Sequence, residues 1–174
     1  MRTSVGVGLF TGLMLLAGCL PPSGSGRVTV HLATDIRARD QLAILEVVVE
    51  TAGVHAAGHP IAANWVTWQV EPHRVDLLTI RPDETLDLGA SNVPAGEYDR
   101  ARIVVEAGKA EGTDGTPIPL ALNIEPIALP FRLKDEDHVE ITIELIALAQ
   151  PDGSYHLFTK SAAIVTSNQI LTVY

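Results

Sequence analysis

Apolar residues recur at every second position along much of the chain after Arg27. The clearest segments place these side chains on one face: Val28, Val30 and Leu32; Leu45, Val47 and Val49; Ala101, Ile103 and Val105; and Val139, Ile141, Ile143 and Leu145. Polar residues fill most of the alternate positions. A period of two is typical of a β-strand with one buried face and one solvated face. The pattern therefore predicts antiparallel sheets that share a common core.

Shorter segments with weaker alternation predict further strands. They are residues 65–70, 74–80, 118–122, 127–133, 155–165 and 169–173. Asp114-Gly115 and Asp152-Gly153 are typical of hairpin turns, and one short helix is expected at 35–42 with Asp35 as its N-cap. Eight to ten short strands in one domain indicate an all-β fold, an antiparallel β-sandwich, with a small barrel as the alternative.

The first eighteen residues have a different character. Arg2 gives them a positive start, and residues 5–17 are uncharged and largely apolar. This stretch is shorter than the ~20 apolar residues that a transmembrane helix needs. Pro21 and Pro22 follow closely and oppose a longer helix. Residues 1–18 are therefore predicted to be a signal peptide.

The single cysteine of the chain closes this segment. Leu16-Ala17-Gly18-Cys19 resembles the bacterial lipobox, so residues 1–18 are interpreted as a lipoprotein signal peptide. The resemblance implies that the Cys19 thiol carries a diacylglycerol and that cleavage occurs just before Cys19. Two or three acyl chains, palmitate among them, give stable membrane anchoring, whereas one chain is marginal. The alternative is an ordinary secretory signal followed by a free cysteine.

The lipobox interpretation divides the chain into three parts. Residues 1–18 are the signal peptide, residues 19–26 are the lipidated cysteine and a flexible tether rich in Pro, Gly and Ser, and residues 27–174 are a single β-sandwich domain. The seven tether residues after Cys19 reach at most about 25 Å. We expect a lipid-anchored protein of the bacterial cell envelope, held to the membrane through acylated Cys19. Because Leu20 and not aspartate follows the cysteine, the outer membrane is favoured over the inner one where a host has two.

Charge and composition exclude several classes of function. The chain has 12 Lys+Arg and 21 Asp+Glu, a net charge of −9, and loss of residues 1–18 removes Arg2 and no acid, which makes it −10. No nucleic-acid partner is expected, because such partners need a basic surface. One cysteine excludes a disulfide scaffold and a cysteine-based metal cluster. An acidic domain is not attracted to an anionic membrane, so the lipid must hold it there.

Three further segments occur in a recognisable order. Thr34-Asp35 ends the first strand, a Trp65-containing strand leads to residues 75–78, and Pro94-Ala95-Gly96-Glu97-Tyr98 precedes the strand at 102–105. Together they resemble DUF4382, a bacterial lipoprotein domain family of unknown function, over residues 27–165. The resemblance implies a lipoprotein and a β-sandwich of the transthyretin-like or carboxypeptidase-regulatory-like kind, and it implies no activity. In the turn before Tyr98 we expect Gly96 to have a positive φ.

Six histidines raise the question of a metal site. His55 and His59 are four residues apart, which places two side chains together only on a helix. Gly53, Gly58 and Pro60 instead indicate a strand end and a loop. No metal and no other cofactor is therefore expected, with His55 and His59 as weak candidates. The acidic run 135–137 is interpreted as a solvated hairpin tip, with calcium binding as the alternative.

Aromatic residues give a second set of candidates. Trp65 and Trp68 are three apart, so on a strand they point to opposite faces and do not form one platform. One of them is expected in the core, and the other, with Tyr155, is a candidate for stacking on a glycan. The outward-facing Arg100 and Arg102 are expected to pair with acids of a neighbouring strand, Glu140 or Glu144.

The chain carries no motif of a catalytic nucleophile, a phosphate-binding loop or a metalloprotease helix. We therefore expect a protein that is not an enzyme: a membrane-anchored envelope lipoprotein whose β-sandwich is a binding or structural module. Its partner is expected to be an envelope protein or a glycan. The alternatives are a carbohydrate-binding module and a metal-binding envelope lipoprotein.

Overall fold

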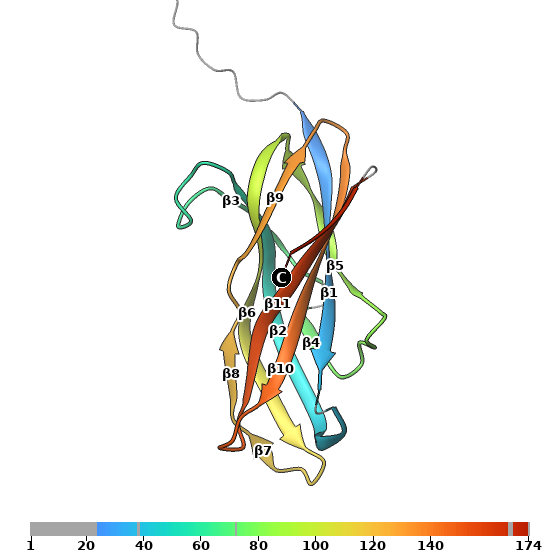
Figure 1. Cartoon of the computed structure of the whole chain (residues 1–174), viewed down its shortest axis with the longest axis vertical. Helices are drawn as coiled ribbons and strands as arrows, with labels where there is room; N and C mark the ends of the chain where they lie inside the picture. The colour runs from blue at the N-terminus through green and yellow to red at the C-terminus, as the bar shows by residue number, and fades with distance from the viewer. Residues whose placement is uncertain (1–23, 38, 72, 167–168, 174) are drawn as a thin grey trace, which may run out of the picture.

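Two β-sheets pack face to face in the computed structural model, which describes residues 24–37, 39–71, 73–166 and 169–173 (Figure 1). Sheet A contains β1 (Ser25–Ile36), β5 (Leu86–Pro94), β8 (Leu120–Asn123), β10 (His138–Ala149), β11 (Tyr155–Thr166) and β12 (Gln169–Val173). Sheet B contains β2 (Leu42–Ala56), β3 (Trp65–Gln69), β4 (Arg74–Asp76), β6 (Gly96–Gly112), β7 (Pro117–Ile118) and β9 (Ile127–Leu133). The prediction of an all-β sandwich is confirmed.

The strand order explains how the chain closes this sandwich. Sheet A has the order β12-β11-β10-β1-β5. β12 pairs with the last part of β11, and β8 pairs with the first part of β11 along the same edge. Sheet B has the order β3-β2-β6-β7, with β4 on β2 and β9 on β6. The pairings β1–β10 and β8–β11 are parallel, so sheet A is mixed and not purely antiparallel as expected. Hairpin turns fix the relative direction only of strands that follow one another along the chain. No such turn joins β1 to β10, because all strands of sheet B lie between them in the sequence.

The core lies between the sheets and is built from the residues that the alternation selected. Val28, Val30 and Leu32 of β1 are 0 % exposed, as are Leu45, Val47 and Val49 of β2. Their partners across the core include Ile103, Ile141, Ile143 and Leu145, all nearly inaccessible. Val105 is the one predicted core residue that is only partly buried. Each fully buried side chain of this kind stabilises the fold by about 1.5–3 kcal/mol.

Several local expectations were wrong. β5 was not expected as a strand, and the segment 35–42 forms only one 3-10 turn, η1 (Arg39–Gln41), while Asp35 belongs to β1. The strand expected at 74–80 ends at Asp76, whose carboxylate accepts a hydrogen bond from the Leu78 N–H at 3.0 Å and turns the chain. Gly96 does lie in the turn between β5 and β6, but its φ is not positive. The Asp-Gly turns are confirmed, with positive φ at Gly115 and Gly153.

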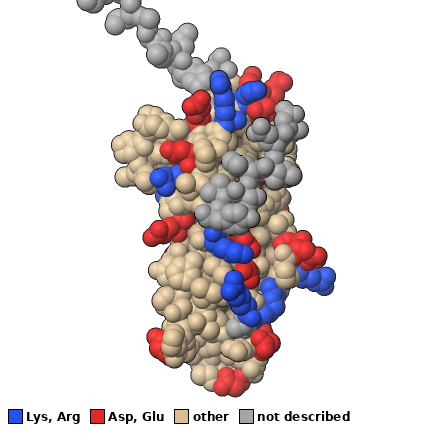
Figure 2. All heavy atoms as spheres, in the orientation of Figure 1, with Lys and Arg blue, Asp and Glu red and all other residues tan. Residues whose placement is uncertain are grey.

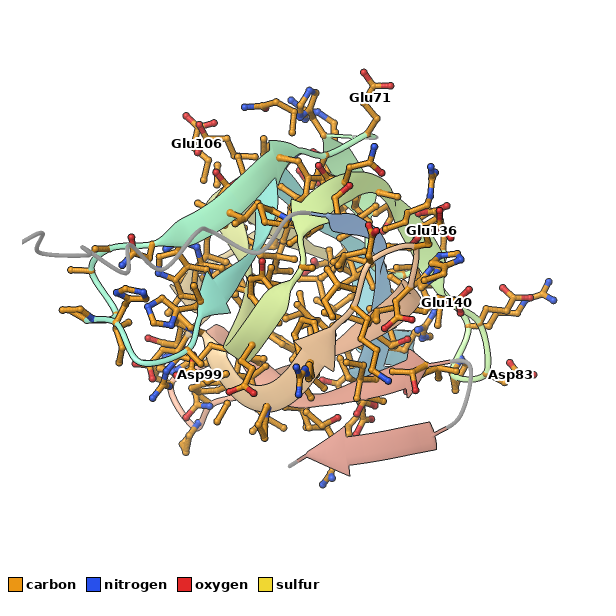
Figure 3. All side chains as sticks on the ribbon, turned by 90° about the horizontal axis from the view of Figure 1, so that it is seen from above. Glu71, Asp83, Asp99, Glu106, Glu136 and Glu140 are labelled. Carbon is orange, nitrogen blue, oxygen red and sulfur yellow. The ribbon has the colours of Figure 1, made fainter. Side chains whose placement is uncertain are left out.

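Three segments meet at one end of the sandwich, drawn at the top of Figure 1: the start of β1, the β5–β6 turn and the β9–β10 turn. The loop that joins β2 to β3 stands out beside them. The β10–β11 and β6–β7 turns lie at the opposite end. Acidic and basic side chains are interspersed over the face seen in Figure 2. Seen along the long axis, Asp99 lies on the side of the β2–β3 loop and away from Asp83 (Figure 3).

Candidate functional site

The loop of residues 57–64 folds over the outer face of sheet B. Hydrogen bonds hold it to the sheet and to itself: the Ala57 N–H donates to the Glu97 carbonyl at 2.8 Å, and the Ala63 N–H donates to the Pro60 carbonyl at 2.9 Å. Asn64 closes the loop with a φ of 59°, in the left-handed region that asparagine tolerates. The loop therefore covers side chains of β2 and β3 that otherwise face solvent.

His55 is the residue that this loop buries. It lies opposite Trp65 in the register of β2 and β3, and its side chain is 0 % exposed. Its Nδ1 lies 2.7 Å from the Asp99 carboxylate, and its Nε2 lies 3.1 Å from the Pro60 carbonyl oxygen. A carboxylate and a carbonyl both accept hydrogen bonds, so this environment favours the doubly protonated ring, which donates from both nitrogens. His55 thus joins β2, β6 and the loop.

The electrostatics agree with this protonation state. The hydrogen bond to Asp99 raises the pKa of His55, and the burial of the ring opposes that shift without cancelling it. The Pro60 carbonyl favours the charged form as well. Asp99 reaches this position because a bulge between Tyr98 and Arg100 interrupts the pairing of β6.

Trp65 and Arg102 form the rest of the cluster. The Trp65 Nε1–H donates to the Ile61 carbonyl at 2.7 Å, and its ring centroid lies 5.2 Å from that of His55. The Arg102 guanidinium lies over the indole at 4.0 Å from the ring centroid. Gly53 stands in register between Arg102 and Thr67, so no side chain blocks the space between β6 and β3. Burial lowers the pKa of Arg102, because the charged form loses solvent.

A pocket opens between this loop and the β5–β6 turn. It has a volume of about 550 Å³. Polar groups on its wall come from His59, Asn64 and Glu97, and Trp65 also lines it. Tyr98 lines the pocket as well, and its hydroxyl donates to the Pro94 carbonyl at 2.7 Å. The pocket combines an aromatic wall with polar groups, as small-molecule sites commonly do.

The three aromatic candidates do not come together. Trp68 points inward and packs against the core, which confirms that the two tryptophans face opposite sides of β3. Tyr155 is only 4 % exposed, and its hydroxyl lies 3.4 Å from Gln41, so its ring is not available for a sugar. That expectation was wrong because Tyr155 falls on the inward-facing positions of β11. Trp65 alone lines the pocket, and Arg102 already covers one of its faces.

The two weak metal candidates lie in different environments. Both nitrogens of His55 are occupied, while His59 is exposed on the loop. In the described ranges, no three His, Cys, Asp or Glu side chains gather in a way that could hold a metal ion. The acidic run at 135–137 serves its own hairpin: Asp135 accepts the Ser25 N–H at 2.9 Å, and Asp137 accepts the Lys134 N–H at 2.9 Å.

The sequence did not reveal that Asp99 contacts His55 or that Arg102 stacks on Trp65. Arg102 was expected to pair with Glu140 or Glu144, but those residues belong to the other sheet. Glu144 instead accepts a bond from Lys160 at 3.1 Å and one from Ser161 at 2.7 Å. The one available signal was a histidine inside the apolar stretch 52–56, since a lone polar residue there needs buried partners.

The lipobox residues Leu16, Ala17, Gly18 and Cys19 lie outside the described residues. The first described residue, Gly24, directly precedes β1. In the part of the chain that the structure describes, no helix has the length and apolar character needed to cross a membrane.

Comparisons with known proteins identify the family but no activity. One family matches, described as "Domain of unknown function (DUF4382)", over residues 25–163. No curated protein and no solved structure gives a match. The match spans β1 to β11 and therefore includes every residue of the His55 cluster. The chain belongs to the DUF4382 family.

Proposed function

We propose that this protein is a lipid-anchored lipoprotein of the bacterial cell envelope whose β-sandwich is a non-catalytic binding module. The anchor is the acylated Cys19, in the Leu16-Ala17-Gly18-Cys19 context. Because β1 begins at Ser25, only five residues separate it from Cys19, and they span at most about 18 Å. A tether this short keeps the domain close to its membrane, and Leu20 after the cysteine favours the outer membrane.

The observation that carries the binding role is the pocket of about 550 Å³ beside the His55 cluster. The cluster holds the 57–64 loop in place, so one wall of the pocket is preformed. Both nitrogens of His55 lie against fixed acceptors, so this ring does not serve as a base toward a molecule in the pocket. The partner is an envelope protein or a glycan, since a net charge of −9 disfavours nucleic acid.

Changing Cys19→Ala tests the anchor. The wild-type protein should fractionate with membranes and carry acyl mass on its N-terminal peptide. The variant should be soluble or remain unprocessed, while Ser23→Ala, a control in the same tether, should behave as wild type. Membrane fractionation of Cys19→Ala equal to that of wild type, with no acyl mass on either protein, would contradict the proposal.

A carbohydrate-binding module is the second candidate, favoured by the presence of Trp65 with Asn64 and Glu97 on one pocket wall. Saccharides hydrogen-bond to such amide and carboxylate groups and stack on indole rings. Titration with a panel of envelope saccharides should give binding that Glu97→Gln weakens. Glu71→Gln, an exposed acid outside the pocket, is the matched control. If the two variants bind equally to wild type, or if no saccharide binds, the pocket is not a glycan site.

A further inference from the structure

The 57–64 loop presents an uncharged, apolar tip to solvent. No Asp, Glu, Lys or Arg occurs between Glu50 and Glu71, which is the longest uncharged stretch after Cys19. Residues 58–64, Gly-His-Pro-Ile-Ala-Ala-Asn, are all exposed. Ile61 is 51 % exposed, more than any other large apolar side chain that the structure describes. Contiguous exposed apolar surface marks sites of contact with a protein or a membrane.

The backbone at this tip already has its hydrogen bonds. The Pro60 carbonyl accepts the Ala63 N–H at 2.9 Å and lies 3.1 Å from Nε2 of His55, and the Ile61 carbonyl accepts the Trp65 Nε1–H at 2.7 Å. A carbonyl that leaves water without a hydrogen-bond partner costs free energy. The tip therefore enters an apolar environment without that cost, and its conformation is fixed before it binds.

The loop lies beside the point where the tether joins the domain. The Gly24 carbonyl accepts the Ala95 N–H at 3.0 Å, and the Glu97 carbonyl accepts the Ala57 N–H at 2.8 Å. Residues 95 and 97 span at most about 7 Å of chain. Figure 1 shows the start of β1 and the loop at the same end of the sandwich. Because Cys19 lies within about 18 Å of the start of β1, a lipid on Cys19 brings the bilayer within reach of the loop.

Charge decides which side of this end faces a membrane. The domain is acidic, with a net charge of −10 once residues 1–18 are removed, so an anionic surface repels it. The acidic run 135–137 lies in the β9–β10 turn at the same end. Seen along the long axis, however, Glu136 of that turn lies on the opposite side of the sandwich from the loop (Figure 3). The loop side is therefore the side that approaches a bilayer without like-charge repulsion.

We propose that the 57–64 loop docks on the bilayer that holds the lipid of Cys19, with Ile61 entering the boundary between headgroups and acyl chains. This inference rests on the proposed lipid anchor. Trp65, half-buried at the base of the loop, then lies at the headgroup level, which indole rings favour. One apolar side chain binds a membrane weakly from solution, but the short tether raises its effective concentration. The docked loop gives the domain one orientation on the membrane.

The test replaces the biological lipid with a chemical one, so that it does not depend on acylation in the cell. The mature chain is coupled through Cys19, its only thiol, to a maleimide lipid in phosphatidylcholine nanodiscs that also contain phosphatidylcholine spin-labelled on its acyl chain. The methyl NMR signal of Ala62, at the loop tip, should be broadened strongly. The signal of Ile118 in β7, at the opposite end of the sandwich, should not be broadened.

Two serine variants locate the contact, with Ala62 as the reporter in both. Ile61→Ser should lower the ratio of docked to undocked molecules about tenfold, because the tip loses its largest apolar side chain. Val165→Ser, which changes the other exposed large apolar residue of the described chain, should alter that ratio less than twofold. Circular dichroism checks that both variants are folded.

The proposal is overturned if Ala62 is broadened no more than Ile118, if the two serine variants have equal effects, or if the broadening centres on residues 135–137. Failure of the anchor would appear elsewhere, in the membrane fractionation and the acyl mass of the protein made in cells. The two failures are therefore distinguishable.

Discussion

The buried ring of His55 leads to a sharp prediction for stability. His55→Ala removes a charge-assisted hydrogen bond of 2.7 Å to Asp99 and a second bond of 3.1 Å to the Pro60 carbonyl. Charge-assisted bonds contribute about 1.5–3 kcal/mol and neutral ones about 1 kcal/mol. Loop groups that lose their hydrogen bond to His55 regain part of their hydration, which offsets part of these two contributions. The free energy of unfolding should therefore fall by about 2–4 kcal/mol. Urea unfolding at neutral pH measures it.

The pH dependence gives the sign of the effect. Because the pKa of His55 is raised in the folded state above its ordinary value of about 6.5, the unfolded chain releases this proton first as the pH increases. The stabilisation is then complete below about pH 6.5 and is lost as the pH rises through the folded-state pKa. The difference in unfolding free energy between wild type and His55→Ala should therefore shrink toward alkaline pH.

A matched control and a double-mutant cycle complete the test. His59→Ala, an exposed histidine in the same loop, should change stability by less than about 0.5 kcal/mol. Asp99→Asn and His55→Ala together should cost less than the sum of their separate effects, by about 1–3 kcal/mol. A loss in His55→Ala no larger than in His59→Ala, or strict additivity with Asp99→Asn, would refute the pairing of His55 with Asp99.

Three further predictions concern packing and charge. Gly53→Ala places a Cβ 2.8 Å from the Val66 carbonyl oxygen and should destabilise the protein by about 1–3 kcal/mol, whereas Gly96→Ala meets nothing closer than 3.7 Å and should be nearly neutral in urea unfolding. Trp68→Phe removes a buried Nε1–H that has no hydrogen-bond partner among the described residues and should cost less than about 1 kcal/mol in the same assay, against about 3 kcal/mol or more for Trp68→Ala. Lys160→Met should lower the melting temperature slightly, because the variant leaves the two acids Asp35 and Glu144 without the cation that they share; an increase in the melting temperature would contradict this.

The period of two was sufficient to predict the sandwich and most of its core, because burial on one face imposes alternation whatever the order of the strands. It failed at β5, where Gly89, Ser91 and Asn92 have little strand propensity. That strand forms because β1 pairs with it over residues 25–32. Pairing of this kind is a property of the whole fold, and a local sequence pattern does not contain it.

The candidate site was less predictable for the same reason. His55 and Asp99 are 44 residues apart and meet only because β2 pairs with β6 and a bulge turns Asp99 toward the ring. The expected ion pair of Arg102 with Glu140 or Glu144 would have joined residues that lie in two different sheets. The sequence indicated which residues were unusual, a histidine among apolar neighbours and outward-facing arginines, but the partners depend on strand order.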